Sequence, residues 1–355
     1  MKYHKSLVLL SLVFVLLSVV QCKVKRAEEG GTSDATSKEV NVYTHRHYPA
    51  DEEILKEFTR QTGIKVNVHF ASADQLMQRL KLEGEKSPAD VLITVDGSRL
   101  YKAVKSDLLQ KVQSPILNRN IPEKFRHPEG YCFSLTYRGR VIMYAKDRVD
   151  PSKLSTYEAL ADPQWEEKVL IRSSANVYNQ SLLSSIIVSD GALKAKNWAK
   201  GLTNNFARAP KGNDRDQIKG VAAGLGDVAV ANTYYLGILA NSKDAIQKDA
   251  AQKVKIFFPN QGPNEKGTHV NISGAGVTKY APNKANAIKL LEFLSSKPIQ
   301  EKFASINYEY PVNPEANWHP MLKSWGTFKT QEINFYDIGK LQEQAKDIFN
   351  QVGWK

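Results

Sequence analysis

The feature that most constrains the fold is an alternation of strand-like and helix-like segments that begins near Val40. The order is strand, helix, strand, helix, strand over residues 40–43, 51–62, 64–70, 73–83 and 89–95. Gly63 follows the first helical segment as a stop signal, and the third segment alternates apolar with polar residues. This order predicts a largely parallel sheet with helices on its faces.

The same alternation continues through the rest of the chain. Strand-like segments cover 133–144, 168–172, 227–231, 254–258 and 271–277, and helical segments cover 181–189, 192–201, 283–296 and 341–352. A chain of 355 residues has the length of about two domains. We therefore predict an α/β protein of two lobes with a ligand between them, and crossovers near 134–144 and 254–277.

Composition excludes several classes of protein. Hydrophobic residues make up 42% of the chain and charged residues 24%, as in ordinary globular proteins, which excludes a mainly disordered, collagen-like or polytopic membrane chain. The net charge is +12, but basic residues are interspersed with acidic ones and no run of five like charges occurs. We expect a solvated basic surface and no nucleic-acid partner.

The N-terminus carries the pattern of an export signal. Lys2 and Lys5 precede an apolar run over 7–20 that is too short to span a bilayer. We predict a signal peptide over 1–21, lipidation of Cys22, and a polar tether over 22–38. Cleavage by the ordinary signal peptidase is the alternative, because Gln21 is larger than the residue that usually precedes a lipidated cysteine. The predicted location is the periplasm or the cell-envelope surface.

Cys132 is the second of two cysteines. With Cys22 lipidated, no partner remains for an intrachain disulfide. We expect Cys132 to be a buried small apolar side chain, and a thiol nucleophile is the alternative.

Common catalytic motifs are missing. The sequence has no G-x-S-x-G, H-E-x-x-H, Walker A or C-x-x-C motif, and Gly224-Leu225-Gly226 is expected to be a turn. We predict that the chain is not an enzyme.

Two groups of polar side chains are candidates for a binding site. His45 and His47 follow the first strand, where they are either exposed polar residues or ligands of zinc or copper. Tyr178, Tyr234 and Tyr235 follow later strands, and tyrosines at such places usually pack in cores or interfaces. The residues alone leave both alternatives open.

Several segments together resemble the ferric-ion-binding proteins of bacterial and cyanobacterial iron ABC transporters. The segments that carry the site are Arg46-His47-Tyr48, Asn176-Val177-Tyr178-Asn179-Gln180 and Ala231-Asn232-Thr233-Tyr234-Tyr235. Further matching segments are 87–92, 171–174, 212–214, 257–261, 267–271, 308–312 and 352–354. The likeness extends from about Val40 to the end of the chain.

The resemblance implies a type II periplasmic-binding-protein fold with Fe³⁺ in the interlobe cleft. It places one lobe at 39–136 plus about 268–312 and the other at 137–267 plus about 313–355. The implied ligands are His47, Tyr48, Tyr178, Tyr234 and Tyr235, which fill five coordination positions without a synergistic anion. The implied partner is an ABC permease. We expect a monomer whose only membrane contact is the possible lipid anchor.

The chemistry of the implied ligands suits Fe³⁺, a hard cation for which phenolate oxygen is a hard anionic donor. Four phenolates exceed the charge of Fe³⁺ by one, so a nearby arginine would offset the excess; Arg46, Arg138 and Arg140 are the candidates, with surface salt bridges as the alternative. His45 departs from the family pattern and is an extra polar neighbour or a spare ligand. Tyr137 also departs from it, and packing is the expected role.

Two other functions compete with iron binding. The same fold can bind a polyamine, thiamine or an oxyanion, with aromatic rings stacking on the ligand. An exported metalloenzyme that uses His45, His47 and a bound water is the third alternative.

Overall fold

The computed structural model describes residues 38–46 and 48–355. Residues 1–37 and His47 lie outside the described residues. The predicted signal peptide, the possible lipidation of Cys22, the tether up to residue 37 and the histidine ligand therefore stay predictions.

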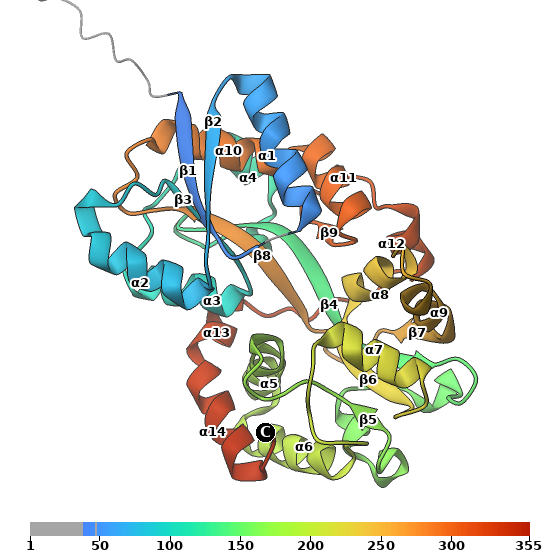
Figure 1. The fold of residues 1–355 in the computed structure, drawn as a ribbon. Helices are drawn as coiled ribbons and strands as arrows, with labels where there is room; N and C mark the ends of the chain where they lie inside the picture. Colours follow the sequence, from blue (N-terminus) through green and yellow to red (C-terminus); the bar gives the residue numbers. More distant parts are fainter. Residues whose placement is uncertain (1–37, 47) are drawn as a thin grey trace, which may run out of the picture. The chain divides into compact units, whose positions relative to one another are not determined.

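Strands and helices alternate along the described chain (Figure 1). The strands are β1 (Glu39–Thr44), β2 (Lys65–Phe70), β3 (Val91–Val95), β4 (Phe133–Ala145), β5 (Val169–Leu170), β6 (Val228–Asn232), β7 (Val254–Phe257), β8 (Val270–Val277) and β9 (Tyr310–Pro311). The first α-helices are α1 (Pro49–Thr62), α2 (Ala73–Glu83), α3 (Gly97–Lys105), α4 (Pro115–Asn120), α5 (Val177–Asp190), α6 (Ala192–Asn204) and α7 (Asp214–Ala222). The others are α8 (Thr233–Ala240), α9 (Ala245–Lys253), α10 (Lys284–Ser295), α11 (Lys297–Ile306), α12 (Pro320–Ser324), α13 (Phe335–Lys340) and α14 (Gln342–Val352).

The strands follow the order β2-β1-β3-β8-β4-β6-β5, and β7 and β9 also pair with β4. The pairs β2–β1, β1–β3 and β5–β6 are parallel, as the alternation of strands and helices predicts. The pairs that β8 and β4 make are antiparallel. The sheet is therefore mixed. At its centre, β8 and β4 are antiparallel to each other, β8 is antiparallel to β3, and β4 is antiparallel to β6.

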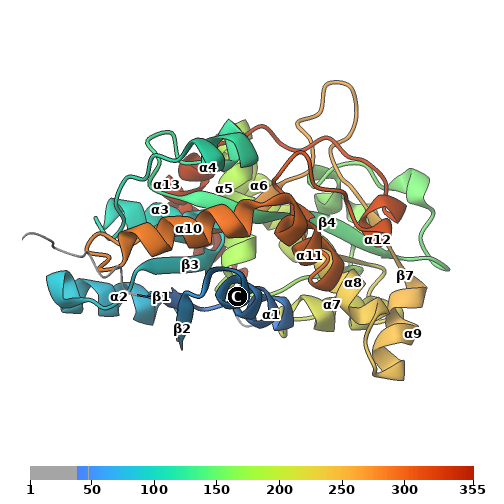
Figure 2. The ribbon, with the colours of Figure 1, turned by 90° about the horizontal axis from the view of Figure 1, so that it is seen from above.

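The long strand β4 joins the two groups of parallel strands. Its first part pairs with β8 and its second part with β6 and β7, and all of its residues are buried. Figure 1 shows it running from the β1–β3 region to the β6–β7 region, and in Figure 2 it lies between α2 and α9. The predicted crossover near 134–144 corresponds to this strand. The second predicted crossover contains β7, a connecting loop and β8.

Local sequence signals explain several helix boundaries. The helix α1 ends at Gly63, whose φ of 71° is a left-handed conformation that favours glycine. The helix α2 begins with a capping box in which Ser72 and Gln75 bond each other's backbone amides. Both helices end where the sequence predicts.

Buried apolar side chains form three clusters. One surrounds β1, β3, β8 and the helices α1, α10 and α11. The second contains residues of α5, α6 and α14, and the third contains residues of α7, α8 and the opposite face of β4 and β6. The strand β2 is at the sheet edge, and Val66 and Val68 are half-buried. The predicted alternation is confirmed only in part, because Asn67 is also half-buried and Phe70 is exposed.

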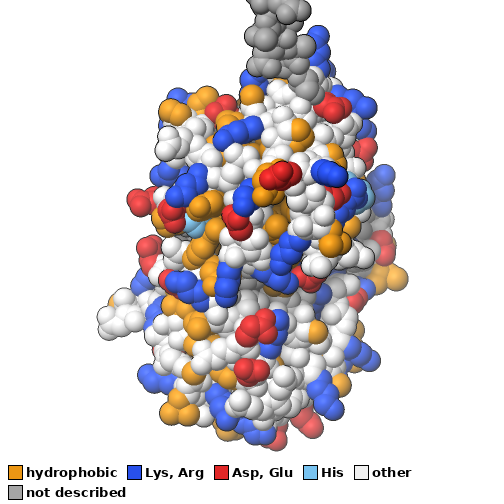
Figure 3. Space-filling model, turned by 90° about the vertical axis from the view of Figure 1, so that its left-hand side faces the viewer, with side chains coloured by type: hydrophobic (Ala, Val, Ile, Leu, Met, Phe, Trp, Pro, Cys, Tyr) orange, Lys and Arg blue, Asp and Glu red, His pale blue; other side chains and the backbone are white. Residues whose placement is uncertain are grey.

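The surface charges and the environment of Cys132 can be compared with the predictions from the sequence. Lys and Arg side chains are interspersed with Asp and Glu on the face shown in Figure 3. In the part of the chain that the structure describes, no helix is both long enough and apolar enough to cross a membrane.

Cys132 is buried, and burial raises the pKa of its thiol to about 12. A thiol that stays protonated is a poor nucleophile, which favours the packing role.

Candidate metal centre

Three helices begin with tyrosines that face one another. Tyr48 is the N-cap residue of α1, Tyr178 lies in the first turn of α5, and Tyr234 and Tyr235 lie in the first turn of α8. A helix N-terminus carries partial positive charge, which favours a negatively charged group in its first turn.

The start of α5 corrects one expectation. The sequence predicts a helix over 181–189 with Tyr178 in the preceding loop, whereas α5 begins at Val177. The side chain of Asn176 accepts a hydrogen bond from the backbone N–H of Tyr178 at 3.1 Å and caps the helix. Most residues of this helix are buried, so it lacks the amphipathic period by which its first turn could have been predicted.

The tyrosine hydroxyls converge. The Tyr48 and Tyr234 hydroxyl oxygens are 3.2 Å apart, and the two ring centroids are 6.1 Å apart with an edge-on geometry. The rings of Tyr234 and Tyr235 are 4.2 Å apart. Tyr178 lies near enough to all three that its charge affects their ionisation. The structure therefore brings together the four tyrosines that the sequence comparison selects.

Burial raises the pKa of three of these phenols. The pKa values of Tyr48, Tyr234 and Tyr235 all lie above the usual value, first because of desolvation and then because of the charge of Tyr178. Glu309 adds to the rise at Tyr48, and Arg46 opposes it. The three phenols are neutral at pH 7 in the absence of a cation, and a bound cation would have to displace their protons.

Arg46 lies against the Tyr48 ring but is neutralised by two carboxylates. Its Cζ atom is 4.9 Å from the ring centroid. Its Nε and Nη2 donate to Asp51 at 3.0 Å, and Nη2 also donates to Glu309 at 2.9 Å. The arginine is almost fully buried. Its charge is therefore already balanced by the protein.

Arg138 has a different environment. Its Cζ atom is 5.2 Å from the centroid of the Tyr178 ring, and the side chain is buried. The ion pair to Asp96 is long, at 3.7 Å, and neither Nη1 nor Nη2 has a hydrogen-bond partner among the residues that the structure describes. Tyr178, Asp96, Tyr234 and Glu309 all favour the charged form of this guanidinium against the cost of burial. Among the three predicted arginines, this one keeps the most charge available to the tyrosines.

Arg140 is also close to Tyr178, at 5.8 Å from the ring centroid. Its Nη1 donates to Asp214 at 2.6 Å and its Nη2 to Asn179 at 2.8 Å. Arg172 lies 5.6 Å from the same ring and 3.5 Å from the other oxygen of Asp214. Arg140 thus forms a buried ion pair with Asp214 beside the site, and not a surface salt bridge.

His45 is engaged by neighbouring residues of the same region. Its Nδ1 lies 3.1 Å from Thr94 Oγ1, and its Nε2 lies 2.9 Å from Arg99 Nη1. Arginine can only donate, so Nε2 accepts this bond. This arrangement favours the role of polar neighbour over that of spare ligand. Tyr137 stacks between Phe125 and Tyr310, which favours the packing role.

Three buried carboxylates near the tyrosines were not predicted from the sequence. They are Glu309, Asp214 and Asp96, which pair with Arg46, Arg140 and Arg138 respectively. Each pair joins residues that are far apart along the chain, so no local pattern indicates it. The segments that contain Glu309 and Asp214 do belong to the resemblance, but neither carboxylate has a motif of its own.

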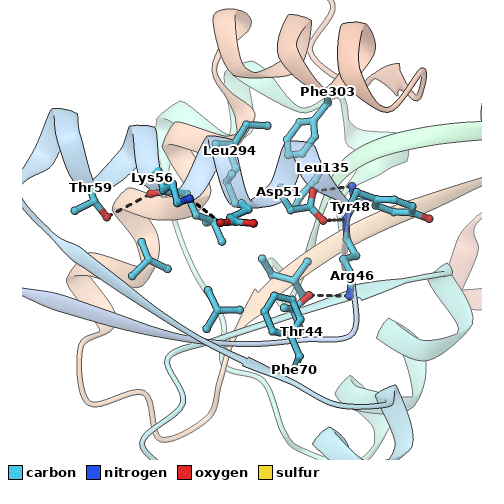
Figure 4. A pocket seen from close by; sticks show the side chains of 16 residues that line it. Thr44, Arg46, Tyr48, Asp51, Lys56, Thr59, Phe70, Leu135, Leu294 and Phe303 are labelled. Carbon is cyan, nitrogen blue, oxygen red and sulfur yellow. Dashed lines mark hydrogen bonds and ion pairs between the residues drawn. The ribbon is translucent and has the colours of Figure 1, made fainter. Parts of the chain in front are cut away.

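A cavity of about 640 Å³ with mostly apolar walls lies beside the Arg46–Asp51 pair, on the side opposite to the Tyr48 ring. Figure 4 shows the Tyr48 ring directed away from this cavity, and Tyr178, Tyr234 and Tyr235 do not line it. Within 38–46 and 48–355, no group of three or more His, Cys, Asp or Glu side chains is arranged to hold a metal ion. The tyrosine cluster is therefore the candidate metal centre.

The fold and the tyrosine cluster define an extracytoplasmic binding protein, and the comparison with known proteins agrees. Residues 53–330 match the family described as bacterial extracellular solute-binding protein, and the chain belongs to this family. Similar solved structures confirm the type II binding-protein fold.

Among individual proteins, the chain is 49% identical to iron uptake protein A1 of Synechocystis over 90% of this chain and 88% of that protein. It is 26% identical to the major ferric iron-binding protein of Neisseria meningitidis, over 89% and 93% of the two chains. A solved Trichodesmium IdiA (FutA) structure, in complex with iron and citrate, is 48% identical with a TM-score of 0.86 and covers 89% of this chain and all of that chain.

Proposed function

We propose that this chain binds ferric iron outside the inner membrane and delivers it to an ABC permease. The observation that carries the proposal is the convergence of four tyrosines from the first turns or N-caps of three helices, with two hydroxyl oxygens 3.2 Å apart. The names of the similar iron uptake and ferric iron-binding proteins support the same cargo.

The donor set favours Fe³⁺ over other cations. Phenolate oxygen is hard and anionic, and its affinity for a trivalent cation is strong enough to displace the phenol protons. Fe²⁺ has less charge to compensate the lost protons, so we expect it to be held less tightly. Reduction therefore offers a route of release.

The proposed ligands are Tyr48, Tyr178, Tyr234 and Tyr235, together with His47. Arg138 is proposed to offset the extra negative charge of four tyrosinates, because its guanidinium is buried beside Tyr178 and its terminal nitrogens lack hydrogen-bond partners in the described part of the chain. Arg46 and Arg140 stay proposed neighbours of the site, although carboxylates already balance them.

The proposed lobes are 39–136 plus about 268–312 and 137–267 plus about 313–355. The three apolar clusters support this division, since the first draws mainly on the first set of residues and the other two on the second. The first cluster also includes Leu322, beyond the proposed boundary, and Tyr234 from the other lobe. A monomeric state, lipidation at Cys22 and the absence of enzymatic activity are part of the same proposal.

The test is a visible-absorption titration of residues 23–355 with ferric citrate. We expect a tyrosinate-to-iron charge-transfer band that saturates at one iron per chain, because phenolate is the donor. Tyr235→Phe should shift or weaken the band. Tyr280→Phe, at an exposed tyrosine of the same chain, is the matched control and should leave it unchanged.

The contrary result separates the other candidate functions. A folded wild-type protein that gives no band with soluble ferric citrate would refute the iron site and direct attention to an organic cation or an oxyanion. A full band in Tyr235→Phe would refute this ligand assignment alone.

A further inference from the structure

Asp96 lies at the junction between β3 and α3 and is fully buried. Its φ of 82° is a left-handed conformation that is costly for most residues other than glycine, although Asp and Asn tolerate it best. Residues held in such conformations cluster at functional sites, where their surroundings compensate the strain. The contacts of the Asp96 side chain indicate what this position does.

The Asp96 carboxylate accepts hydrogen bonds from three directions. Its Oδ1 accepts from the backbone N–H of Ser98 at 3.1 Å and from the hydroxyls of Ser98 and Ser181, both at 2.7 Å. Its Oδ2 accepts from the Asn271 amide at 2.8 Å and lies 3.7 Å from Arg138 Nη2. One side chain thus connects α3 with α5, β8 and β4.

Two of these contacts lead to Tyr178. Ser181 follows Tyr178 by almost one turn of α5, so the Asp96–Ser181 bond fixes the helical turn that carries the tyrosine. Arg138 lies over the Tyr178 ring, and Asp96 is the carboxylate with which it forms an ion pair. Asp96 therefore contacts both the helix that carries this phenol and the cation that faces its ring.

We propose that Asp96 is a positioning residue for the ferric site, which fixes the Tyr178 phenol by holding the first turn of α5 and the guanidinium of Arg138. The inference rests on the proposed function. In outer coordination shells, the groups that orient metal ligands tune affinity strongly, so loss of this carboxylate should weaken iron binding even though Asp96 touches no iron.

The chain offers a matched control at the other end of the same strand. Asp90 precedes β3, is also fully buried, and accepts bonds from the backbone N–H of Asn41 at 2.7 Å and of Asn283 at 2.6 Å. Its side-chain hydrogen bonds go to Asn41 of β1 and to Asn283, the N-cap of α10, neither of which is a site residue. Asp90 and Asp96 thus share burial and bonding but differ in what they hold.

The experiment compares Asp96→Asn with Asp90→Asn in the iron titration described above. Asparagine keeps the size of the side chain and tolerates positive φ, but it removes the charge beside Arg138 and replaces one acceptor oxygen with a donor. We expect Asp96→Asn to shift the charge-transfer band and to weaken iron binding about 10–100-fold. Asp90→Asn should lose thermal stability but keep the wild-type band and affinity.

Two further measurements keep the inference testable if Asp96→Asn folds poorly. Ser181→Ala removes the bond to Asp96 and the bond that Gln342 donates to the same hydroxyl, but it keeps Asp96 beside Arg138. It should shift the band in the same direction by a smaller amount. Hydrogen exchange in iron-free protein should be faster at 178–181 in Ser181→Ala than in wild type, because the turn has lost an anchor.

The outcomes separate this inference from the proposed function. A wild-type protein without the band would refute the ferric site itself. A wild-type band that persists at the same wavelength and affinity in both Asp96→Asn and Ser181→Ala would overturn the positioning role and leave the ferric site intact. An equal shift in Asp90→Asn would also overturn it, because the effect would then be one of general stability.

Discussion

Arg46 and Arg138 are buried arginines that lie over different tyrosine rings of the site, and they differ in how their charge is balanced. Arg46, beside Tyr48, has short bonds to both Asp51 and Glu309. Within 38–46 and 48–355, Arg138, beside Tyr178, has one long ion pair and two terminal nitrogens without hydrogen-bond partners. The same residue type therefore serves the fold at one ring and keeps charge for the site at the other. Proximity to a ligand alone does not identify a charge-compensating group.

Acidification should have the largest effect on iron affinity, because it acts on several phenols of the proposed site at once. The buried phenols have raised pKa values and are neutral without iron, so iron binding through the proposed tyrosinate ligands would release their protons. Affinity should rise with pH and fall on acidification, by about tenfold per pH unit for each proton released. Competition with a chelator of known pH dependence measures this slope. An affinity for free Fe³⁺ that does not change with pH would mean that neutral groups bind the iron.

Arg46→Met should have the next largest effect, and on stability. It leaves the Glu309 carboxylate buried without its cation, and breaking a buried pair in this way costs about 3–5 kcal/mol of unfolding free energy. Urea unfolding of the iron-free protein measures the loss. A variant as stable as wild type would show that Arg46 is not a structural cation.

In contrast to Arg46→Met, Arg138→Met should reduce iron affinity more than it reduces stability. Asp96 keeps its hydrogen bonds to Ser98, Ser181 and Asn271, so the fold should lose less stability than in Arg46→Met. Iron affinity should fall by about 10–100-fold, because a group that supports the ligands is lost. The titration and the urea curve together check both parts. If Arg138→Met lost stability but no affinity, the contrast between the two arginines would be wrong.

Asp51→Asn should have the smallest effect of the series. The asparagine oxygen can still accept one bond from Arg46, and Glu309 still balances the guanidinium, so the loss should be about 1–3 kcal/mol. The same unfolding measurement ranks it against Arg46→Met. A loss as large as that of Arg46→Met would mean that Asp51, and not Glu309, is the main counter-ion.

The sequence predicts most of the elements but not the pairs that organise the site. The strand and helix patterns place β1, α1, α2 and β4 within a few residues, because apolar period, glycine stops and caps are local signals. The insertion of β8 and β4 between the parallel strands has no local signal. Neither has the contact of Arg46 with Glu309, which are 263 positions apart in the sequence.

In the candidate site, too, some features follow from the sequence and others depend on tertiary contacts. The tyrosines at 178, 234 and 235 can be selected only because several segments together resemble a known family, since each segment alone favours a packing role. The differing environments of the three arginines, and the role of Asp96, depend on side chains brought together by tertiary structure. No local pattern can predict them.

The long strand β4 has a consequence for how the chain is made. Its partners lie far away in the sequence, as the pairs Phe133–Ala275 and Arg140–Asn232 show. Contacts between distant segments slow folding, since a long loop must close before they form. A chain crossing a membrane from its N-terminus could not complete the central sheet until β8 had emerged. Slow assembly of this sheet would keep the chain unfolded and competent for export for longer.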